Sequence, residues 1–184
     1  MSKPESNLRL FVAAYPPEGT VRSMLRLLRK LELPDHRPTP LEQVHLTIQF
    51  IGDTPANDLD HVVESVERSA SGLRSFALQP QRLVSLPLRG PARLVAMETD
   101  APPPLPELHR RLVTRLAHAV RSKLDDRFLP HFTLCRFRRP TPIEPIEQLV
   151  TLDPFPVARI VLMRSVLGPQ GAAHHEVAGF ELDE

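Results

Sequence analysis

A pattern of four residues, histidine, apolar, threonine, apolar, occurs twice in this sequence of 184 residues. The first copy, His-Leu-Thr-Ile, spans residues 45 to 48, and the second, His-Phe-Thr-Leu, spans residues 131 to 134. Alternation of polar and apolar side chains is typical of a β-strand with one buried face. Each tetrad therefore predicts a strand whose histidine and threonine share the open face, whereas its two apolar side chains point to the core.

The segments around the two tetrads follow the same order of expected elements: strand, helix, strand, helix, strand. In the first half, apolar runs bounded by turn residues predict strands at residues 8–15, 44–51 and 76–86. In the second half, similar runs predict strands at residues 93–99, 131–137 and 157–167, and residues 175–182 are expected to add a last strand after this order. Helices are expected between the strands, including one that carries Leu108, Leu112, Leu116 and Val120 and a short one at residues 143–150.

Two halves with the same order of elements indicate an internal duplication. We therefore expect a single bilobal domain of two pseudo-repeat halves, at about residues 1–88 and 89–184. Several connections are too short for parallel crossovers, which favours an α+β fold with mostly antiparallel sheets. If a pseudo-twofold axis relates the halves, the two faces that carry histidine and threonine converge on one cleft.

Two histidines in one cleft suit acid–base chemistry at a phosphodiester. Hydrolysis of a cyclic phosphate needs a base that takes a proton from water and an acid that gives a proton to the leaving oxygen. The ordinary histidine pKa of about 6.5 allows both roles near neutral pH. Threonine hydroxyls can donate hydrogen bonds to the phosphate oxygens, so the scheme requires neither a metal nor a cofactor. A single tetrad is more often part of an ordinary strand, but two copies at matching positions favour catalysis.

The composition argues against several other classes of site. The 23 Lys and Arg residues nearly balance the 22 Asp and Glu residues, whereas proteins that coat duplex nucleic acid are usually more basic. The seven glycines form no phosphate-cradling loop, so an ATP-dependent ligase is not indicated. The remaining histidines lack the spacing of a metal site, and no metal is expected.

The cysteine content and the hydropathy predict the compartment. Cys135 is the single cysteine, so an internal disulfide is impossible and a reducing cytoplasm is the expected location. No run of about 18 apolar residues predicts a membrane span. Simple alternation places Cys135 on the face of His131, although a small core residue is the favoured interpretation. We expect a monomer.

With these motifs, the chain resembles the 2H phosphoesterase superfamily, and within it the LigT-like RNA 2',3'-cyclic phosphodiesterases, also called 2'-5' RNA ligases. The resemblance rests on VHLTIQFIGD at residues 44–53 and LPHFTLCRF at residues 129–137. FVAAYPPE near the N-terminus and SVLGPQGAAHHEVAGFEL at residues 165–182 also match the layout of that family. The resemblance implies a bilobal, pseudo-twofold α+β fold, with two sheets facing a central V-shaped cleft and the helices outside.

The resemblance also implies a reaction, in which the 2',3'-cyclic phosphate end of an RNA is opened to a 2'-phosphate. By analogy, His131 is the general base on water and His45 is the general acid to O3', with Thr47 and Thr133 beside the phosphate. The sequence leaves these two roles open, because they exchange in the reverse reaction. In that reaction, a 5'-hydroxyl attacks the cyclic phosphate and a 2'-5' linkage forms.

Three further residues are candidates for substrate binding. Arg136, five residues after His131, matches a phosphate or substrate contact of the family, but simple alternation places it on the opposite face, so the strand must end or bulge before it. Phe50, five residues after His45, either stacks near the base or packs in the core, and core packing is the favoured interpretation. Arg37 either reaches RNA phosphate or is a solvated loop charge, which is the favoured interpretation. The adjacent histidines at residues 174 and 175 stand where relatives often carry an aromatic residue.

Two other functions stay open on the sequence alone. The same fold could act on a small cyclic nucleotide, an ADP-ribose cyclic phosphate or a 2',5'-oligoadenylate. It could also be a nucleotide- or RNA-binding module that has lost catalysis, although both histidines and both threonines are intact. Arginines along an extended cleft would favour RNA as the partner, whereas a closed pocket would favour a small molecule.

Overall fold

The structure is a computed structural model that describes residues 7–116, 128–169 and 171–184. Its strands are β1 (Leu8–Ala14), β2 (His36–Pro38), β3 (Leu46–Thr54), β4 (Phe76–Leu78), β5 (Pro80–Leu86), β6 (Ala92–Thr99), β7 (His131–Thr141), β8 (Glu147–Leu149), β9 (Phe155–Val157), β10 (Arg159–Gly168) and β11 (Gly171–Glu181). Its helices are α1 (Glu18–Leu28), α2 (Leu59–Ala70) and α3 (Pro104–Arg115), with 3-10 turns at Leu41–Gln43 and Ala56–Asp58. Among the described residues, none of the helices is long and apolar enough to cross a membrane.

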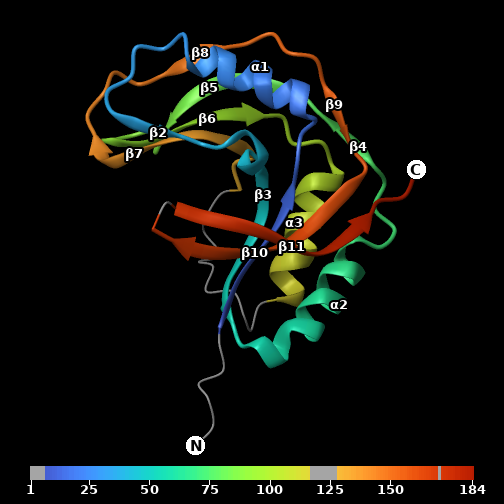
Figure 1. The fold of residues 1–184 in the computed structure, drawn as a ribbon. Coiled ribbons are helices and arrows are strands. Elements are labelled where there is room, and N and C mark those ends of the chain that lie inside the picture. The colour runs from blue at the N-terminus through green and yellow to red at the C-terminus, as the bar shows by residue number, and fades with distance from the viewer. Residues whose placement is uncertain (1–6, 117–127, 170) are drawn as a thin grey trace, which may run out of the picture.

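The long strands form two antiparallel lobes that meet at one residue pair. The first lobe has the order β11-β10-β1-β3, and the second has the order β7-β6-β5-β8 with β2 added on β7. The two ladders are joined where Leu46 of β3 pairs with Phe132 of β7. Helix α1 lies beside the second lobe, and α2 and α3 lie beside the first (Figure 1). The expected α+β fold with antiparallel sheets is confirmed.

The lobes of the structure do not follow the halves of the sequence. The first lobe combines β1 and β3 with β10 and β11 from the end of the chain. The second lobe takes β5 from the first half and pairs it with β6 and β8. Strands are therefore exchanged between the halves, and the lobe boundary is not at residue 88. The division at about residues 1–88 and 89–184 stays a prediction about an internal duplication.

The prediction of a short helix at residues 143–150 is wrong. This segment contains strand β8, which pairs with Arg82, Leu83 and Val84 of β5. Prolines stand at positions 140, 142 and 145, and a proline removes a backbone donor and disfavours a helical conformation of the residue before it. The chain therefore stays extended and adds to the free edge of β5. For the helix expected to carry Leu108 and Val120, α3 ends at Arg115 and Val120 lies outside the described residues.

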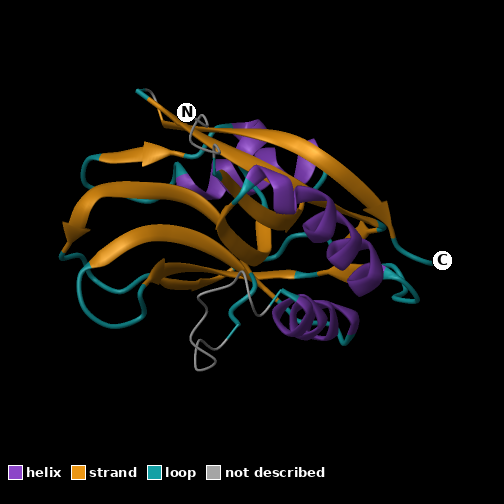
Figure 2. Cartoon of the chain, turned by 90° about the horizontal axis from the view of Figure 1, so that it is seen from below, coloured by secondary structure: helices purple, strands orange, loops and turns teal. Residues whose placement is uncertain are grey.

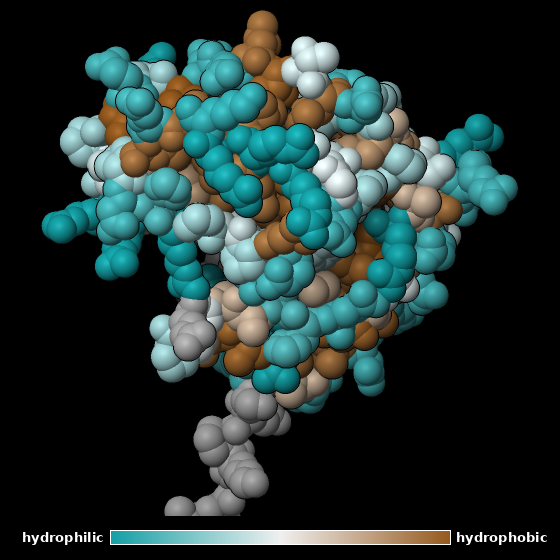
Figure 3. Space-filling view, turned by 45° about the horizontal axis from the view of Figure 1, so that its top comes forward, coloured by the Kyte–Doolittle hydropathy of each residue, from teal (hydrophilic) through white to brown (hydrophobic). Residues whose placement is uncertain are grey.

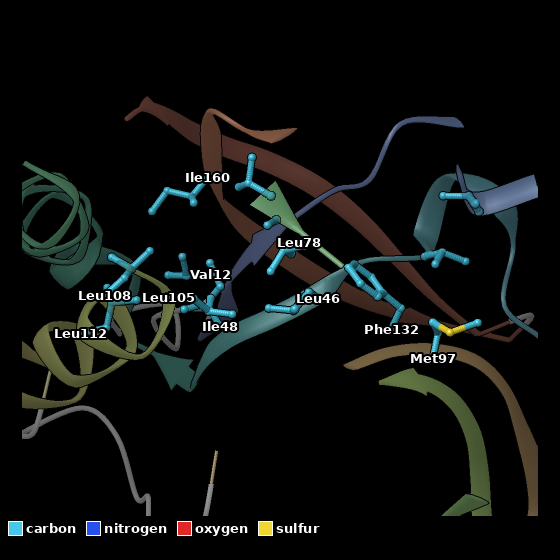
Figure 4. Packing of buried hydrophobic residues seen from close by; sticks show 14 of the residues in the cluster. Val12, Leu46, Ile48, Leu78, Met97, Leu105, Leu108, Leu112, Phe132 and Ile160 are labelled. Atoms are coloured by element: carbon cyan, nitrogen blue, oxygen red, sulfur yellow. The ribbon is translucent and has the colours of Figure 1, made fainter. Parts of the chain in front are cut away.

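A continuous core holds the two tetrads in place. It runs from Leu108 of α3, past Leu46, to Phe132 and Met97 of the second lobe (Figure 4). The apolar members of both tetrads are almost completely inaccessible to solvent, so each histidine stands on a strand whose other face is tightly packed. The long strands curve strongly (Figure 2), and the face drawn in Figure 3 is mostly hydrophilic.

We expect Leu46→Ala to lower the free energy of unfolding by about 2–5 kcal/mol, because it empties a fully buried site where the two lobes join. Urea unfolding followed by circular dichroism measures the change. Leu149→Ala is the matched control, since Leu149 is 83% exposed and its truncation leaves no cavity. A loss below 1 kcal/mol for Leu46→Ala would contradict the packing described above.

Candidate active site

Each tetrad strand contains an extra residue at the same position of its motif, and a second irregularity in the pairing follows further along each strand. On β3, the pairing with β1 shifts between Thr47 and Gln49, so that Ile48 is the extra residue. On β7, the pairing with β6 shifts between Thr133 and Cys135. A residue that is inserted into one strand of an antiparallel pair forms a β-bulge and reverses the alternation of faces beyond it. The two bulges are therefore equivalent features of the two lobes.

The bulges determine which side chains lie on the same strand faces as the two histidines. Beyond the bulge of β7, Arg136 returns to the open face of His131, and Cys135 is buried in the core. The bulge required for the assignment of Arg136 is thus present. Beyond the bulge of β3, Phe50 returns to the face of His45 and is 46% exposed, so the core-packing interpretation of Phe50 is wrong.

A neighbouring helix supports the bulge of β3. His109 of α3 lies with its Nδ1 2.7 Å from the backbone oxygen of Ile48, and a carbonyl oxygen only accepts, so Nδ1–H is the donor. The ring of His109 also stacks on Phe128, with a centroid distance of 4.3 Å. His109 thereby gives the carbonyl of the extra residue a hydrogen-bond partner.

A cavity of about 690 Å³ lies where the open faces of the two motif strands meet. Its wall includes all seven residues that the sequence predicts for the site: His45, Thr47, Phe50, His131, Thr133, Arg136 and Arg37. His45 and Thr47 come from the β3 side and His131 and Thr133 from the β7 side, as the shared-face argument predicts. Within the described residues, no group of three or more His, Cys, Asp or Glu side chains is arranged to hold a metal ion.

The backbone fixes both catalytic candidates in the same tautomer. The Nδ1 atom of His45 lies 2.7 Å from the backbone oxygen of Gln43, and Nδ1 of His131 lies 2.7 Å from that of Leu129. Since each carbonyl can only accept, Nδ1 carries the hydrogen in both rings, and Nε2 of a neutral ring has a free lone pair. The Nε2 atom of His45 is 3.1 Å from the hydroxyl oxygen of Thr47.

The environment of His45 strongly disfavours its charged form. Burial lowers the pKa of His45 to about 4, an effect partly opposed by the hydrogen bond to the Gln43 carbonyl. The neighbouring side chains of His174, Arg136 and His131 lower the pKa of His45 further. At neutral pH, His45 is therefore an uncharged imidazole in the free site.

Comparison with known proteins identifies the family. The model of the 2'-5' RNA ligase superfamily matches residues 16–168. This chain belongs to the 2'-5' RNA ligase superfamily. The match confirms the resemblance drawn from the two tetrads, and with it the prediction of an enzyme that acts on phosphodiester bonds.

Individual relatives agree with this family assignment. The RNA 2',3'-cyclic phosphodiesterase of Thermus thermophilus is 28% identical to this chain, over 95% of this chain and 90% of that protein. The crystal structure of TT0787 of Thermus thermophilus has a TM-score of 0.81 at 25% identity and covers 95% of this chain and 97% of its own. The crystal structure of E. coli LigT complexed with 3'-AMP has a TM-score of 0.76 at 22% identity and covers 96% and 99% of the two chains.

Two arginines of this 2'-5' RNA ligase superfamily member reach the cavity from opposite lobes. Arg37 belongs to strand β2 and not to a loop, and its guanidinium lies over the backbone of Gly171 in β11, where an added Cβ would stand 2.5 Å from Nη2. The expected loop is therefore a strand, but Arg37 is exposed, and its contact with RNA phosphate stays a prediction. On the other side, the guanidinium of Arg9 lies 5.1 Å from the ring centroid of Phe50, within the range of a cation–π contact.

Arg9, Phe11 and His174 also line the cavity, although the sequence did not predict them as site residues. Arg9 lies two residues before Phe11, so the two side chains share one face of their strand. A single charged residue in an otherwise apolar strand is a sequence signal for a site. The rings of Phe11 and His174 pack on His45, with centroid distances of 5.0 Å and 5.2 Å. These contacts contribute to the burial of His45 but follow from pairing between distant strands, which the sequence does not display.

We expect the imidazole of His45 to titrate with a midpoint near pH 4 in the free protein, because burial disfavours the charged ring. Above that pH the ring is neutral, and on acidification it gains a proton well below the ordinary histidine range. NMR observation of the imidazole C–H resonances measures the midpoint, and His45→Gln identifies the signal by its loss. A midpoint near 6.5 would contradict the assigned environment.

Proposed function

We propose that this protein hydrolyses the 2',3'-cyclic phosphate end of RNA to a 2'-phosphate by two-histidine acid–base catalysis. The observation that carries the proposal is the matched pair of His45 and His131. Each is fixed at Nδ1 by a backbone carbonyl and lines one cavity beside a threonine. One chain contributes both halves of this arrangement, so a monomer is sufficient for the reaction.

In the proposed reaction, the cyclic phosphate lies between the two imidazoles. The hydroxyls of Thr47 and Thr133 donate to its non-bridging oxygens, and Arg136 supplies a positive charge that stabilises the transition state. Nε2 of His131 takes a proton from water as the water oxygen attacks phosphorus. The bond from phosphorus to O3' breaks, and His45 gives its proton to O3'. Exchange of protons with solvent then restores both rings. If a 5'-hydroxyl attacks phosphorus in place of water and O3' leaves as before, the product is a 2'-5' linkage.

The low pKa of His45 imposes a condition on this assignment. As a general acid, His45 must carry a proton at Nε2 when the bond to O3' breaks, yet the free ring is neutral near pH 7. The bound phosphate is anionic, and an anion beside the ring favours the imidazolium form. Substrate binding and protonation of His45 are therefore coupled under this proposal.

Charge distribution in the cavity supports RNA as the substrate. Arg9, Arg37 and Arg136 all line it, at separate positions on β1, β2 and β7. A mononucleotide has one phosphate for Arg136, whereas a longer strand offers further phosphates to Arg9 and Arg37. The named activity of the Thermus thermophilus relative and the 3'-AMP complex of E. coli LigT support a nucleotide end as well.

We expect wild-type protein to convert a short RNA with a 2',3'-cyclic phosphate to the 2'-phosphate in the presence of EDTA. His45→Ala and His131→Ala should each lower kcat about 100- to 10,000-fold, the usual contribution of one proton transfer. Products are resolved from the 3'-phosphate by chromatography. His61→Ala is the control, because His61 is exposed on α2 and outside the cavity.

The alternatives give different outcomes in the same assay. Folded wild-type protein that binds the RNA without turnover would be a binding module that has lost catalysis. Turnover of cyclic mononucleotides or of 2',5'-oligoadenylate, with none of the RNA end, would assign a small-molecule substrate. Loss of activity in EDTA that added metal restores would refute the metal-independent scheme.

A substrate with sulfur in place of O3' separates the roles of the two histidines. A thiolate leaves without protonation, because thiols are far more acidic than alcohols. We expect His45→Ala to cleave this substrate within about tenfold of the wild-type rate, whereas His131→Ala stays as defective as on the oxygen substrate. Rates from single-turnover assays on both substrates measure the difference. The reverse pattern would assign His131 as the acid and His45 as the base.

A further inference from the structure

A second cavity, of about 560 Å³, adjoins the catalytic cavity. The two share Gln43, Ala173 and His174 in their walls. The other residues of the second cavity are Tyr15, Glu42, Arg159, Val161, Met163 and Glu176. The proposed reaction uses none of these side chains.

The boundary between the two cavities is a thin wall of side chains. Nε2 of Gln43 donates to the backbone oxygen of Ala172 at 3.0 Å, which ties the turn before β3 to β11. The ring of His174 lies 5.2 Å from that of His45, and the ring of Tyr15 lies 5.4 Å from it. A molecule in the second cavity therefore lies beside two rings that are close to His45. In the proposed reaction, His45 is the residue that donates a proton to O3'.

Two polar atoms at this cavity are buried without a partner. Among the described residues, the hydroxyl of Tyr15 and Nδ1 of His174 make no hydrogen bond. Buried polar groups are nearly always paired, so an unpaired group in a cavity wall is a candidate for contact with a ligand. Burial, with the nearby charge of Glu176, raises the pKa of Tyr15 to about 12, so its hydroxyl keeps its proton.

The cavity combines an apolar floor with carboxylates at its edge. Val161 and Met163 of β10 pack together with Tyr15 and form the floor. Glu176 is paired with Arg159 at 2.5 Å, whereas Glu42 makes no ion pair within the described residues. The arginines of the catalytic cavity suit phosphate, but a free carboxylate repels phosphate and accepts from N–H groups. The second cavity therefore suits an uncharged flat ring with an amino group.

We propose that the second cavity binds a nucleobase of the RNA strand that carries the cyclic phosphate, and that it favours bases with an exocyclic amine over uracil. This inference rests on the proposed function. The base lies on Val161 and Met163, its amine donates to the carboxylate of Glu42, and its ring or ribose polar atoms meet Tyr15 and His174. Uracil places a carbonyl oxygen where cytosine has its amine, so an acceptor would face the carboxylate.

Free nucleosides test this inference without any phosphate chemistry. We expect cytidine to shift the NMR signals of Tyr15 and His174 on titration, and uridine to bind about tenfold more weakly, since one charge-assisted hydrogen bond is lost. Glu42→Gln should bring the two affinities within about threefold, because an amide can also donate to the uracil oxygen. Tyr15→Phe should weaken the binding of both nucleosides. Glu32→Gln, an exposed site outside both cavities, is the matched control and should leave the ratio unchanged.

Equal affinities of cytidine and uridine for the wild type would overturn the proposal. So would an absence of binding up to the solubility of the nucleosides, or shifts confined to Phe50 and Arg9 in the catalytic cavity. These results are independent of the hydrolysis assay, because a nucleoside has no phosphate to react. Failure of the second cavity and failure of the proposed function are therefore distinguishable.

Discussion

The site depends on the β-bulge that lies within the histidine–threonine motif of each of two strands. In a regular strand, the residue five positions after a histidine points to the opposite face. The bulges on β3 and β7 reverse that alternation, so Phe50 joins His45 and Arg136 joins His131. The bulge on β3 is held by a side chain of α3, so the packing of that helix on the sheet also sets the geometry of the motif strand.

Backbone carbonyls fix the tautomer of both histidines in the same way, and packing also shifts the pKa of His45. Both rings receive their Nδ1 partner from the residue two positions earlier, which presents Nε2 to the cavity. His45 is further enclosed by Phe11 and His174, and its pKa falls to about 4. A general acid must hold its proton when the leaving group departs, so under the proposed reaction the anionic phosphate must favour the charged form of His45.

The sequence predicts what local patterns determine and misses what pairing between distant strands determines. Alternation was sufficient to place both histidines and threonines on open strand faces, and the bulge before Arg136 followed from a conflict between alternation and family resemblance. The exchange of strands between the halves was not predictable, because the hydropathy of β10 does not reveal that its partner is β1. Strand β8 was missed for a related reason, since its extended conformation depends on the free edge of β5.

Under the two proposals, the first cavity binds phosphate and the adjacent second cavity binds a base. Contacts to phosphate provide affinity that is independent of sequence, whereas contacts to base edges provide selectivity. The first cavity gathers Arg9, Arg37 and Arg136, and the second has an apolar floor with Glu42 at its edge. His174 borders both cavities, so a base seated in the second would pack against the same ring that helps to keep His45 neutral. Under the two proposals, the identity of the base and the protonation of the acid are therefore physically linked through His174.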